Sequence, residues 1–198
     1  MTTRAEVCDG VSIRAAIRRE VASIRAIDEL EEIHQVDALA WIDSGAPLCR
    51  TAKPATPPKH LVSYFAVVDQ QDILLVDHKS AQLWLPPGGH VELGEHPRET
   101  VVRELFEELR VAPRHEIREP LMVTCATTVG LTAGHVDVSL WYVVTADRSQ
   151  SIQFDDQEFS AAKWFRYSDI PLHRSDPHLG RFLKKLGSNN WLAESREP

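Results

Sequence analysis

The sequence has only three cysteines in 198 residues, and no long apolar run. Cys8, Cys49 and Cys125 are widely spaced, so we expect free thiols in a reducing, cytoplasmic compartment rather than a disulfide framework. No apolar run approaches the ~18 residues that a membrane-spanning helix needs, so we expect no membrane partner. The stretch from Met1 to Arg14 is polar and mixed in charge, which is not the pattern of a secretory signal.

The sequence also lacks an excess of basic residues. It has 22 Lys and Arg against 29 Asp and Glu, a net charge of −7. A general nucleic-acid binder or a protein of anionic membranes usually presents a basic face, so we expect neither role. A small phosphorylated substrate remains compatible with this charge, because metal ions can offset carboxylates locally. The length allows one compact domain plus an extension, and no internal repeat is evident.

The N-terminal part of the sequence predicts a pair of helices. Apolar residues recur at helical spacing from Ser12 to Ser44. Asp28 followed by Glu31 is typical of a capping box that starts the second helix, and Gly45 would end that helix. The apolar positions of the second helix include Leu30, Ile33, Leu39 and Ile42. Prolines follow, so we expect residues 1–58 to form a helical extension with a proline-rich linker.

Beyond residue 58 the pattern is that of strands, and we expect a separate domain at residues 59–190 followed by a tail at 191–198. Strand-forming residues fill His60–Val68, Ile73–Asp77, Leu83–Leu85, Leu121–Thr128, Val136–Val144 and Lys163–Tyr167. A turn is expected at Gly130–Gly134. Ser175 or Asp176 would cap a last helix that has Pro177 at its first position and runs to Gly187. These elements, with one helix between them, predict a mixed α/β (α+β) sandwich.

That central helix is acidic and follows a glycine loop. Pro86–Gly89 ends a short apolar run, and the helix that follows carries Glu104, Glu107 and Glu108. At about 100° per residue these three glutamates fall within roughly one 100° arc. The opposite arc is expected to face the core, and it contains Val102, Leu105, Phe106 and Leu109.

Three carboxylates on one arc repel each other by a few tenths of a kcal/mol per pair. A cation between them would turn this cost into a binding site. Hard divalent ions such as Mg²⁺ prefer oxygen ligands of this kind. An acidic run on a helix is usually only a solvated face, but here a glycine loop, an arginine and a distant glutamate accompany it.

The whole stretch resembles the signature of the Nudix hydrolases, Gly-x5-Glu-x7-Arg-Glu-apolar-x-Glu-Glu-x-Gly-apolar. The matching identities are Gly89, Glu95, Arg103, Glu104, Glu107 and Glu108, while Leu105 and Val111 fill the apolar places. Arg110 stands where the family has glycine. The resemblance covers about residues 60–187. It implies a Nudix-type mixed-sheet α/β/α sandwich, here with an N-terminal helical extension.

The resemblance also implies roles for these residues. Glu104, Glu107 and Glu108 would bind Mg²⁺, or Mn²⁺, together with the backbone carbonyl of Gly88. Among them Glu108 is the expected ligand, and Glu104 would serve as a ligand or as the base. Arg103 is expected to pair with Glu107, four residues later, and to orient the ligands.

Two other positions of the signature are structural. Glu95 would have a structural role just before a helix that begins at Pro97, where a negative charge favours the helix dipole. The family glycine ends this helix, and in the left-handed conformation Arg110 would cost about 1 kcal/mol. No metal ligand is lost at Arg110, so we expect the site to remain intact.

The implied activity is that of a Mg²⁺-dependent pyrophosphohydrolase, which cleaves the diphosphate linkage of a nucleoside diphosphate derivative or a nucleotide. A rival interpretation is a catalytically weak sensor that binds a nucleotide or ADP-ribose. An isomerase of prenyl diphosphates lacks support because no cysteine lies at a persuasive position. The apolar face of the N-terminal helices suits either packing or a homodimer.

Further candidates also have structural explanations, which are as good as the functional ones or better. Glu158, near Asp155 and Asp156, could be an additional acid or a solvated loop residue. His90 could contact phosphate or be merely exposed. His135 and Asp137 alternate on one strand face, as substrate contacts or as hydrogen-bonded sheet residues. Trp84 and Tyr64 could stack on a base, although aromatic residues on strands more often belong to the core.

Overall fold

The computed structural model describes residues 4–53, 55–128 and 134–188, with side chains from Ser12 onward. The helices are α1 (Arg4–Ser23), α2 (Glu29–Asp43), α3 (Pro97–Leu109) and α4 (Leu179–Ser188). The strands are β1 (Lys59–Asp69), β2 (Asp72–His78), β3 (Leu83–Leu85), β4 (Gly88–His90), β5 (Met122–Thr127), β6 (Val136–Thr145) and β7 (Phe159–Arg166). Two short 3₁₀ turns, η2 (Tyr167–Asp169) and η3 (Leu172–Arg174), precede α4. The turn expected at Gly130–Gly134 lies mostly outside the described residues.

The strands form one mixed sheet in the order β3-β2-β1-β6-β5, with β4 beside β1 and β7 beside β2. The long strands β1 and β6 are parallel, and His60 lies opposite Asp137 in their register. All other strand pairs are antiparallel. The short strand β4 places Gly89 opposite Ser63 of β1. The sequence did not predict a strand at the glycine loop, but Gly88–His90 form one by pairing with β1.

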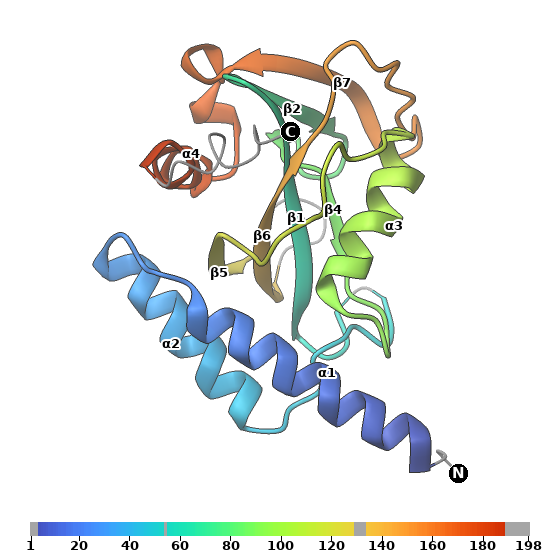
Figure 1. Ribbon diagram of the computed structural model, residues 1–198, viewed down its shortest axis with the longest axis vertical. Coiled ribbons are helices and arrows are strands. Elements are labelled where there is room, and N and C mark those ends of the chain that lie inside the picture. Colours follow the sequence, from blue (N-terminus) through green and yellow to red (C-terminus); the bar gives the residue numbers. More distant parts are fainter. Residues whose placement is uncertain (1–3, 54, 129–133, 189–198) are drawn as a thin grey trace.

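Helices cover both faces of the sheet, which gives the expected α/β/α arrangement (Figure 1). Side chains alternate along β1: Leu61 and Phe65 pack in one cluster with apolar residues of α1, α2 and α3, while Ala66 and Val68 pack in a second cluster with α4. In Figure 1 the sheet runs between α3 and α4, and α1 and α2 cross below it.

The N-terminal helical pair is present and begins earlier than expected. Arg14 and Arg18 of α1 bond to the end of α2 and the residues after it, with Arg18 Nε 2.7 Å from Asp43 Oδ1. The Asp28 side chain caps α2 by accepting from the Glu31 backbone N–H, as predicted. Gly45 follows the end of this helix at a φ of +77°.

The two predicted hydrophobic stripes are each correct in part. Leu105 and Leu109 of α3 and Ile42 of α2 are buried, and Leu39 of α2 packs against the core. On α3, Val102 and Phe106 are 52% and 61% exposed, because the helix is turned so that Val101 takes their place in the core. On α2, Leu30 and Ile33 are also exposed. Gln35 lies on the side of α2 that faces α1, where its side-chain amide donates to the backbone carbonyls of Val21 and Ile24.

Other boundaries differ from the sequence prediction by a few residues. β7 begins at Phe159 rather than Lys163, because it pairs with the whole of β2. α4 begins at Leu179 rather than Pro177, and Asp176 accepts from the backbone N–H of His178.

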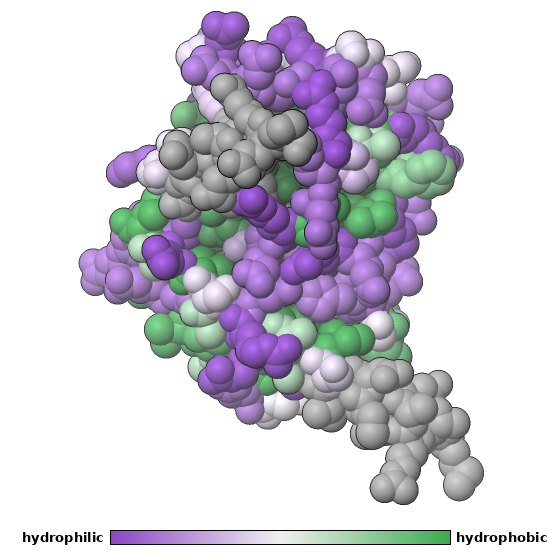
Figure 2. All heavy atoms as spheres, viewed as in Figure 1, coloured by the Kyte–Doolittle hydropathy of each residue, from purple (hydrophilic) through white to green (hydrophobic). Residues whose placement is uncertain are grey.

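Within the described ranges no helix is both long and apolar enough to cross a bilayer. On the face shown in Figure 2, hydrophobic patches interrupt a mainly hydrophilic surface.

Candidate functional site

Strand β4 can approach α3 closely because it contains two glycines. A Cβ atom on Gly89 would lie 1.9 Å from Oε1 of Glu104, and a Cβ atom on Gly88 would lie 2.4 Å from the carbonyl oxygen of Ser63. Neither position therefore has room for a side chain. The glycine loop thus brings the backbone of β4 directly against the acidic face of α3.

Helix α3 is fixed at both ends. The side chain of His96 accepts from the backbone N–H of Arg98, and Glu99 returns a bond to the backbone N–H of His96, which forms a capping box. Pro97 is the first helical residue, as predicted. At the other end Arg110 adopts the left-handed conformation, with a φ of +54°. The expected left-handed position of Arg110 is therefore confirmed, and its guanidinium lies 4.5 Å from the centre of the Phe106 ring.

Arg103 links the acidic residues of the signature. Its Nε and Nη2 donate to the two carboxylate oxygens of Glu95, at 2.9 and 3.0 Å. Its Nη1 donates to Glu104 at 2.6 Å and lies 3.4 Å from Glu107, so the expected pair with Glu107 is present. Its Nη2 also donates to the backbone carbonyl of His90 at 3.2 Å. One guanidinium thereby holds β4, the loop at Glu95 and the face of α3 together.

The three helix glutamates have different surroundings. Glu108 is 4% exposed, whereas the side chain of Glu107 is 57% exposed and turns toward Arg103. Burial raises the pKa of Glu108 well above its usual range, and the nearby charges of Glu104 and Glu158 add to this, while a backbone hydrogen bond from Gly88 opposes it. Burial also raises the pKa of Glu104, against the opposing influence of Arg103.

The segment before β7 lies at the C-terminal end of α3. Backbone N–H groups of Gln153 and Asp155 donate to the carbonyls of Leu109 and Glu108, both at 3.1 Å, which satisfies carbonyls that the helix leaves open. Glu158 follows on this segment, with Oε1 3.2 Å from Nε2 of His78. Its charge helps to raise the pKa of both Glu104 and Glu108, so the fold brings this candidate acid close to the helix glutamates.

The observed donor set fits a hard divalent cation. Oε2 of Glu108 is buried and has no hydrogen-bond partner among the residues that the structure describes. The charge of the partly buried Glu104 raises the cost of ionising the buried Glu108, and a positive ion between the two carboxylates would offset that cost. Carboxylate and backbone carbonyl oxygens are the ligands that Mg²⁺ and Mn²⁺ take.

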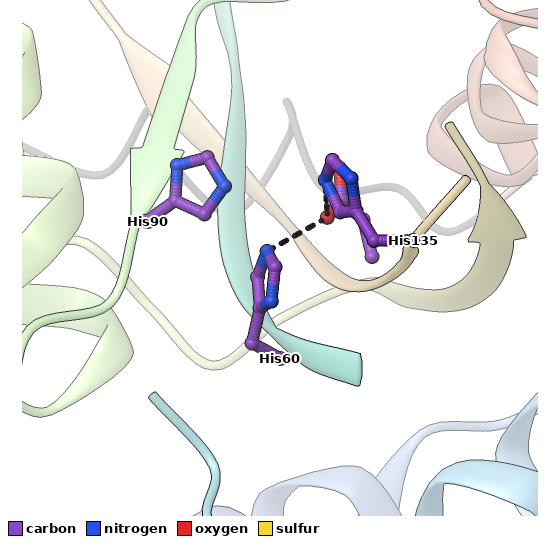
Figure 3. A group of neighbouring side chains, drawn as sticks. His60, His90 and His135 are labelled. Atoms are coloured by element: carbon purple, nitrogen blue, oxygen red, sulfur yellow. Dashed lines mark ion pairs between the residues drawn. The ribbon is translucent and has the colours of Figure 1, made fainter. Parts of the chain in front are cut away.

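His90 and His135 lie away from these glutamates, in a second group of side chains. The group contains His60, His90, His135 and Asp137, and Figure 3 shows the three rings turned toward one another. The His60 ring stacks on His135 at 4.9 Å and lies 4.9 Å from His90. Burial, followed by the charge of Arg50, lowers the pKa of His90 to about 4, so His90 is neutral near pH 7.

His60 was not singled out from the sequence. It is separated from His90 by 30 positions and from Asp137 by 77, so sequence spacing gives no signal. The signal is in the strand register, which places His60 opposite Asp137 and Val62 opposite His90.

The two aromatic candidates contact the core. The ring of Tyr64 packs edge-on against Trp141 at 5.0 Å, and the ring of Trp84 packs against Phe165 at the same distance. Both belong to the margin of the cluster under α4. Their positions in the structure favour the packing role over base stacking.

Comparison with known proteins agrees with the residues and the fold. The NUDIX domain family matches residues 59–186. A MutT-like protein of Streptomyces ambofaciens is 29% identical over 133 residues, which cover 66% of this chain and 80% of that protein. The Nudix hydrolase YvcI of Bacillus subtilis (strain 168), described as uncharacterized, is 29% identical over 118 residues, covering 57% and 72%.

Solved structures give the same result. A MutT NUDIX hydrolase from Burkholderia pseudomallei superposes with a TM-score of 0.50 at 27% identity, covering 57% of this chain and 87% of that one. The NUDIX domain of Shewanella oneidensis NrtR, crystallised with ADP-ribose, has a TM-score of 0.51 at 24% identity, covering 65% and 86%, and supports the fold alone. The chain therefore belongs to the Nudix family of hydrolases, which act on phosphoric anhydride bonds.

Proposed function

We propose that this protein is a Mg²⁺-dependent pyrophosphohydrolase that cleaves the diphosphate linkage of a nucleoside diphosphate derivative or a nucleotide, with Mn²⁺ as an alternative ion. Glu104, Glu107 and Glu108 would hold the metal with the carbonyl of Gly88. Glu158 is the candidate for an additional acid. The substrate would be a small molecule, in keeping with an acidic protein.

One observation carries the proposal. Glu108 is almost fully buried, yet one of its carboxylate oxygens has no hydrogen-bond partner within the described part of the chain, and two other glutamates add negative charge beside it. A buried carboxylate in this state costs free energy unless a cation or a proton compensates it. A protein that only needed a stable helix would have an apolar residue at this position.

The position of the Glu104 carboxylate is set by Arg103, Glu95 and Gly89. Arg103 positions Glu104 through the 2.6 Å bond and is itself fixed by Glu95. Gly89 leaves space for the Glu104 carboxylate against β4. A bound Mg²⁺ would offset the charge of the diphosphate oxygens and make water a better nucleophile.

In the reaction the oxygen of water forms a bond to phosphorus, and the bond from phosphorus to the bridging oxygen breaks. A carboxylate of the site accepts the proton of water, and Glu104 is the candidate when it does not bind the metal, because burial raises its pKa. The leaving phosphate takes the electron pair of the broken bond. Two phosphorylated products result.

The test is turnover of a panel of nucleoside diphosphate derivatives and nucleotides with Mg²⁺, with the products identified by mass spectrometry. The Glu108→Gln variant keeps the size of the side chain and removes its charge. We expect kcat to fall by about 10²- to 10⁴-fold. Glu116→Gln is the matched control, since Glu116 is exposed on the loop after α3, and it should leave kcat unchanged.

Equal turnover by Glu108→Gln and wild type would contradict the proposed mechanism. Binding of ADP-ribose or a nucleotide without any turnover across the panel would favour the sensor interpretation instead. A single product containing the whole substrate would indicate isomerisation. The homodimer stays a prediction, to be measured by light scattering in the same preparations.

A further inference from the structure

The histidine group lies on the face of the sheet opposite α3. Along β1, His60 has the same side-chain direction as Ala66 and Val68, which pack under α4. The group is therefore separate from the helix glutamates. It is formed by His60, His90, His135 and Asp137, and one potential ligand atom from each lies within 4.8 Å of the others.

The hydrogen bonds of His60 and His135 leave their inner nitrogens available. Nδ1 of His60 lies 2.8 Å from the backbone carbonyl of Pro57. A carbonyl only accepts, so Nδ1 carries the proton and Nε2 of the neutral ring presents a lone pair to the group. Nδ1 of His135 lies 3.1 Å from the Thr128 hydroxyl, while its Nε2 lies 3.3 Å from Asp137 Oδ1.

The atoms that meet inside the group are buried and unsatisfied. Nε2 of His60, Nε2 of His90 and Oδ1 of Asp137 are buried, and none has a hydrogen-bond partner among the described residues. Asp137 Oδ1 lies 3.3 Å from both His60 Nε2 and His135 Nε2, but in neither case with the geometry of a hydrogen bond. The side chains of His60 and His135 are 0% and 4% exposed, so water does not readily compensate them.

We propose that His60, His90, His135 and Asp137 bind a Zn²⁺ ion, as a second metal site distinct from that of the helix glutamates. Imidazole nitrogen suits Zn²⁺, whereas Mg²⁺ requires oxygen ligands. Three histidines and one carboxylate complete the four-coordinate shell of a closed zinc site.

The geometry is close to what such a shell requires. Zinc–ligand bonds of about 2.0–2.1 Å place tetrahedral ligand atoms about 3.3–3.4 Å apart. The two 3.3 Å separations at Asp137 Oδ1 already have this value. The remaining separations, at most 4.8 Å, would shorten as the ion binds.

The ring nitrogens that point away from the proposed ion have the hydrogen-bond partners that metal-binding histidines commonly have. A ligating histidine usually donates its other N–H to a carbonyl, a carboxylate or water, which fixes the ring and its tautomer. The Pro57 carbonyl does this for His60, and the Thr128 hydroxyl lies in the corresponding position for His135.

The ion would join three strands where β1 and β6 begin and β4 ends. His60 belongs to β1, His90 to β4, and His135 and Asp137 lie at the start of β6 (Figure 3). His90 directly follows Gly89, and its backbone carbonyl accepts from Arg103. The zinc site would therefore stabilise the strand against which Glu104 packs, without taking part in catalysis. This inference does not depend on the proposed hydrolase activity.

The first test uses the full chain, depleted of metal with a chelator and then titrated with ZnCl₂ or CoCl₂. We expect one Zn²⁺ per chain, a higher Tm with Zn²⁺, and a visible Co²⁺ spectrum of the strong, tetrahedral kind. Zinc binding with no such Co²⁺ spectrum, or no zinc binding by the folded wild-type protein, would overturn the proposal.

The second test uses variants checked for folding by circular dichroism. His135→Gln and Asp137→Asn each remove one zinc ligand. Loss of a residue that only hydrogen-bonds to a ligand costs about 10- to 100-fold in metal affinity. We expect the loss of a ligand itself to lower zinc affinity by more than this. His173→Gln, at an exposed histidine of η3, should bind zinc like wild type.

A third variant separates the two proposed metal sites. Glu108→Gln should lose turnover and keep full zinc affinity, so failure of the hydrolase proposal would leave the zinc result unaffected. Unchanged zinc affinity in both His135→Gln and Asp137→Asn would overturn the proposal even if the wild-type protein binds zinc elsewhere.

Discussion

At the scale of single residues, the site depends on Gly89 having no side chain. We expect Gly89→Ala to fold and to lose turnover by about 10-fold or more, because a Cβ atom 1.9 Å from Glu104 Oε1 displaces that carboxylate. Steady-state kinetics at saturating Mg²⁺, with thermal melting as the folding check, measures this.

Gly187→Ala is the matched control. Apart from the chain neighbours and the helix's own backbone, no atom of the described residues lies within 4 Å of the added Cβ at this exposed position of α4, and alanine is the better helix former. Its turnover should equal that of wild type, with a Tm that is equal or slightly higher. If Gly89→Ala behaved in the same way as Gly187→Ala, the close packing of β4 on Glu104 would be irrelevant to activity.

Residues whose roles follow from local spacing were largely predictable from the sequence. The ion pair of Arg103 with Glu107 and the left-handed Arg110 follow from the pattern and from helix geometry. The exposure of Phe106 was not predictable, because the apolar residues of α3 span an arc of about 140° and the pattern does not fix which part of that arc meets the sheet. His60 was missed for another reason, since only the register of β1 and β6 brings it to Asp137.

At the scale of elements, a buried ion pair joins α4 to α2. The side chains of Lys185 and Glu31 are each 1% exposed, and Nζ donates to Oε1. We expect Lys185→Met to lower the free energy of unfolding by about 3–5 kcal/mol, because Glu31 would remain as an uncompensated buried charge. Urea denaturation monitored by circular dichroism measures this change.

The double variant Lys185→Met with Glu31→Gln is the control for this ion pair. In wild type, Oε2 of Glu31 accepts from the backbone N–H of Ile27 at 3.0 Å, and the side-chain carbonyl of glutamine can still accept this bond. The double variant should therefore recover part of the lost stability. A double variant less stable than Lys185→Met alone would contradict this explanation.

The start of α4 should make stability depend on pH. Burial, with the charges of His34 and Arg181, lowers the pKa of His178 to about 4, and only Asp28 opposes this. In the unfolded chain the pKa is about 6.5, so between these values the unfolded state binds more protons. The stability contribution of His178 is therefore complete above pH 6.5 and is lost as the pH falls toward 4.

As the pH falls from 6.5 to 4, we expect the free energy of unfolding of His178→Asn to decrease by about 1–2 kcal/mol less than that of wild type, after allowance for solvent screening. Burial raises the pKa of Asp176 to about 6, which acts in the opposite direction, so the variant and wild type are compared at each pH. His173→Asn, at an exposed histidine, should follow the wild-type curve. Parallel curves for His178→Asn and wild type would show that His178 does not titrate as stated.

At the scale of the whole molecule, the order of strands and helices was enough to predict a mixed α/β sandwich, and the resemblance to the Nudix hydrolases added the α/β/α arrangement. The order of strands was not predictable, because the parallel pairing of β1 with β6 joins residues that are 77 positions apart in sequence. That pairing assembles the histidine group, whereas the glutamate site is formed within one contiguous stretch. Sequence therefore pointed to the first of the two proposed metal sites and left the second to the structure.

The central claim is that Glu104 and Glu108 hold a divalent cation beside β4. Binding of Mn²⁺ to the full chain, measured by electron paramagnetic resonance, tests it most directly. We predict that wild type binds Mn²⁺, that Mg²⁺ competes, and that Glu104→Gln with Glu108→Gln reduces Mn²⁺ affinity by at least about 100-fold, while Glu116→Gln does not. Mn²⁺ affinity in the folded double variant equal to that of wild type would contradict the account.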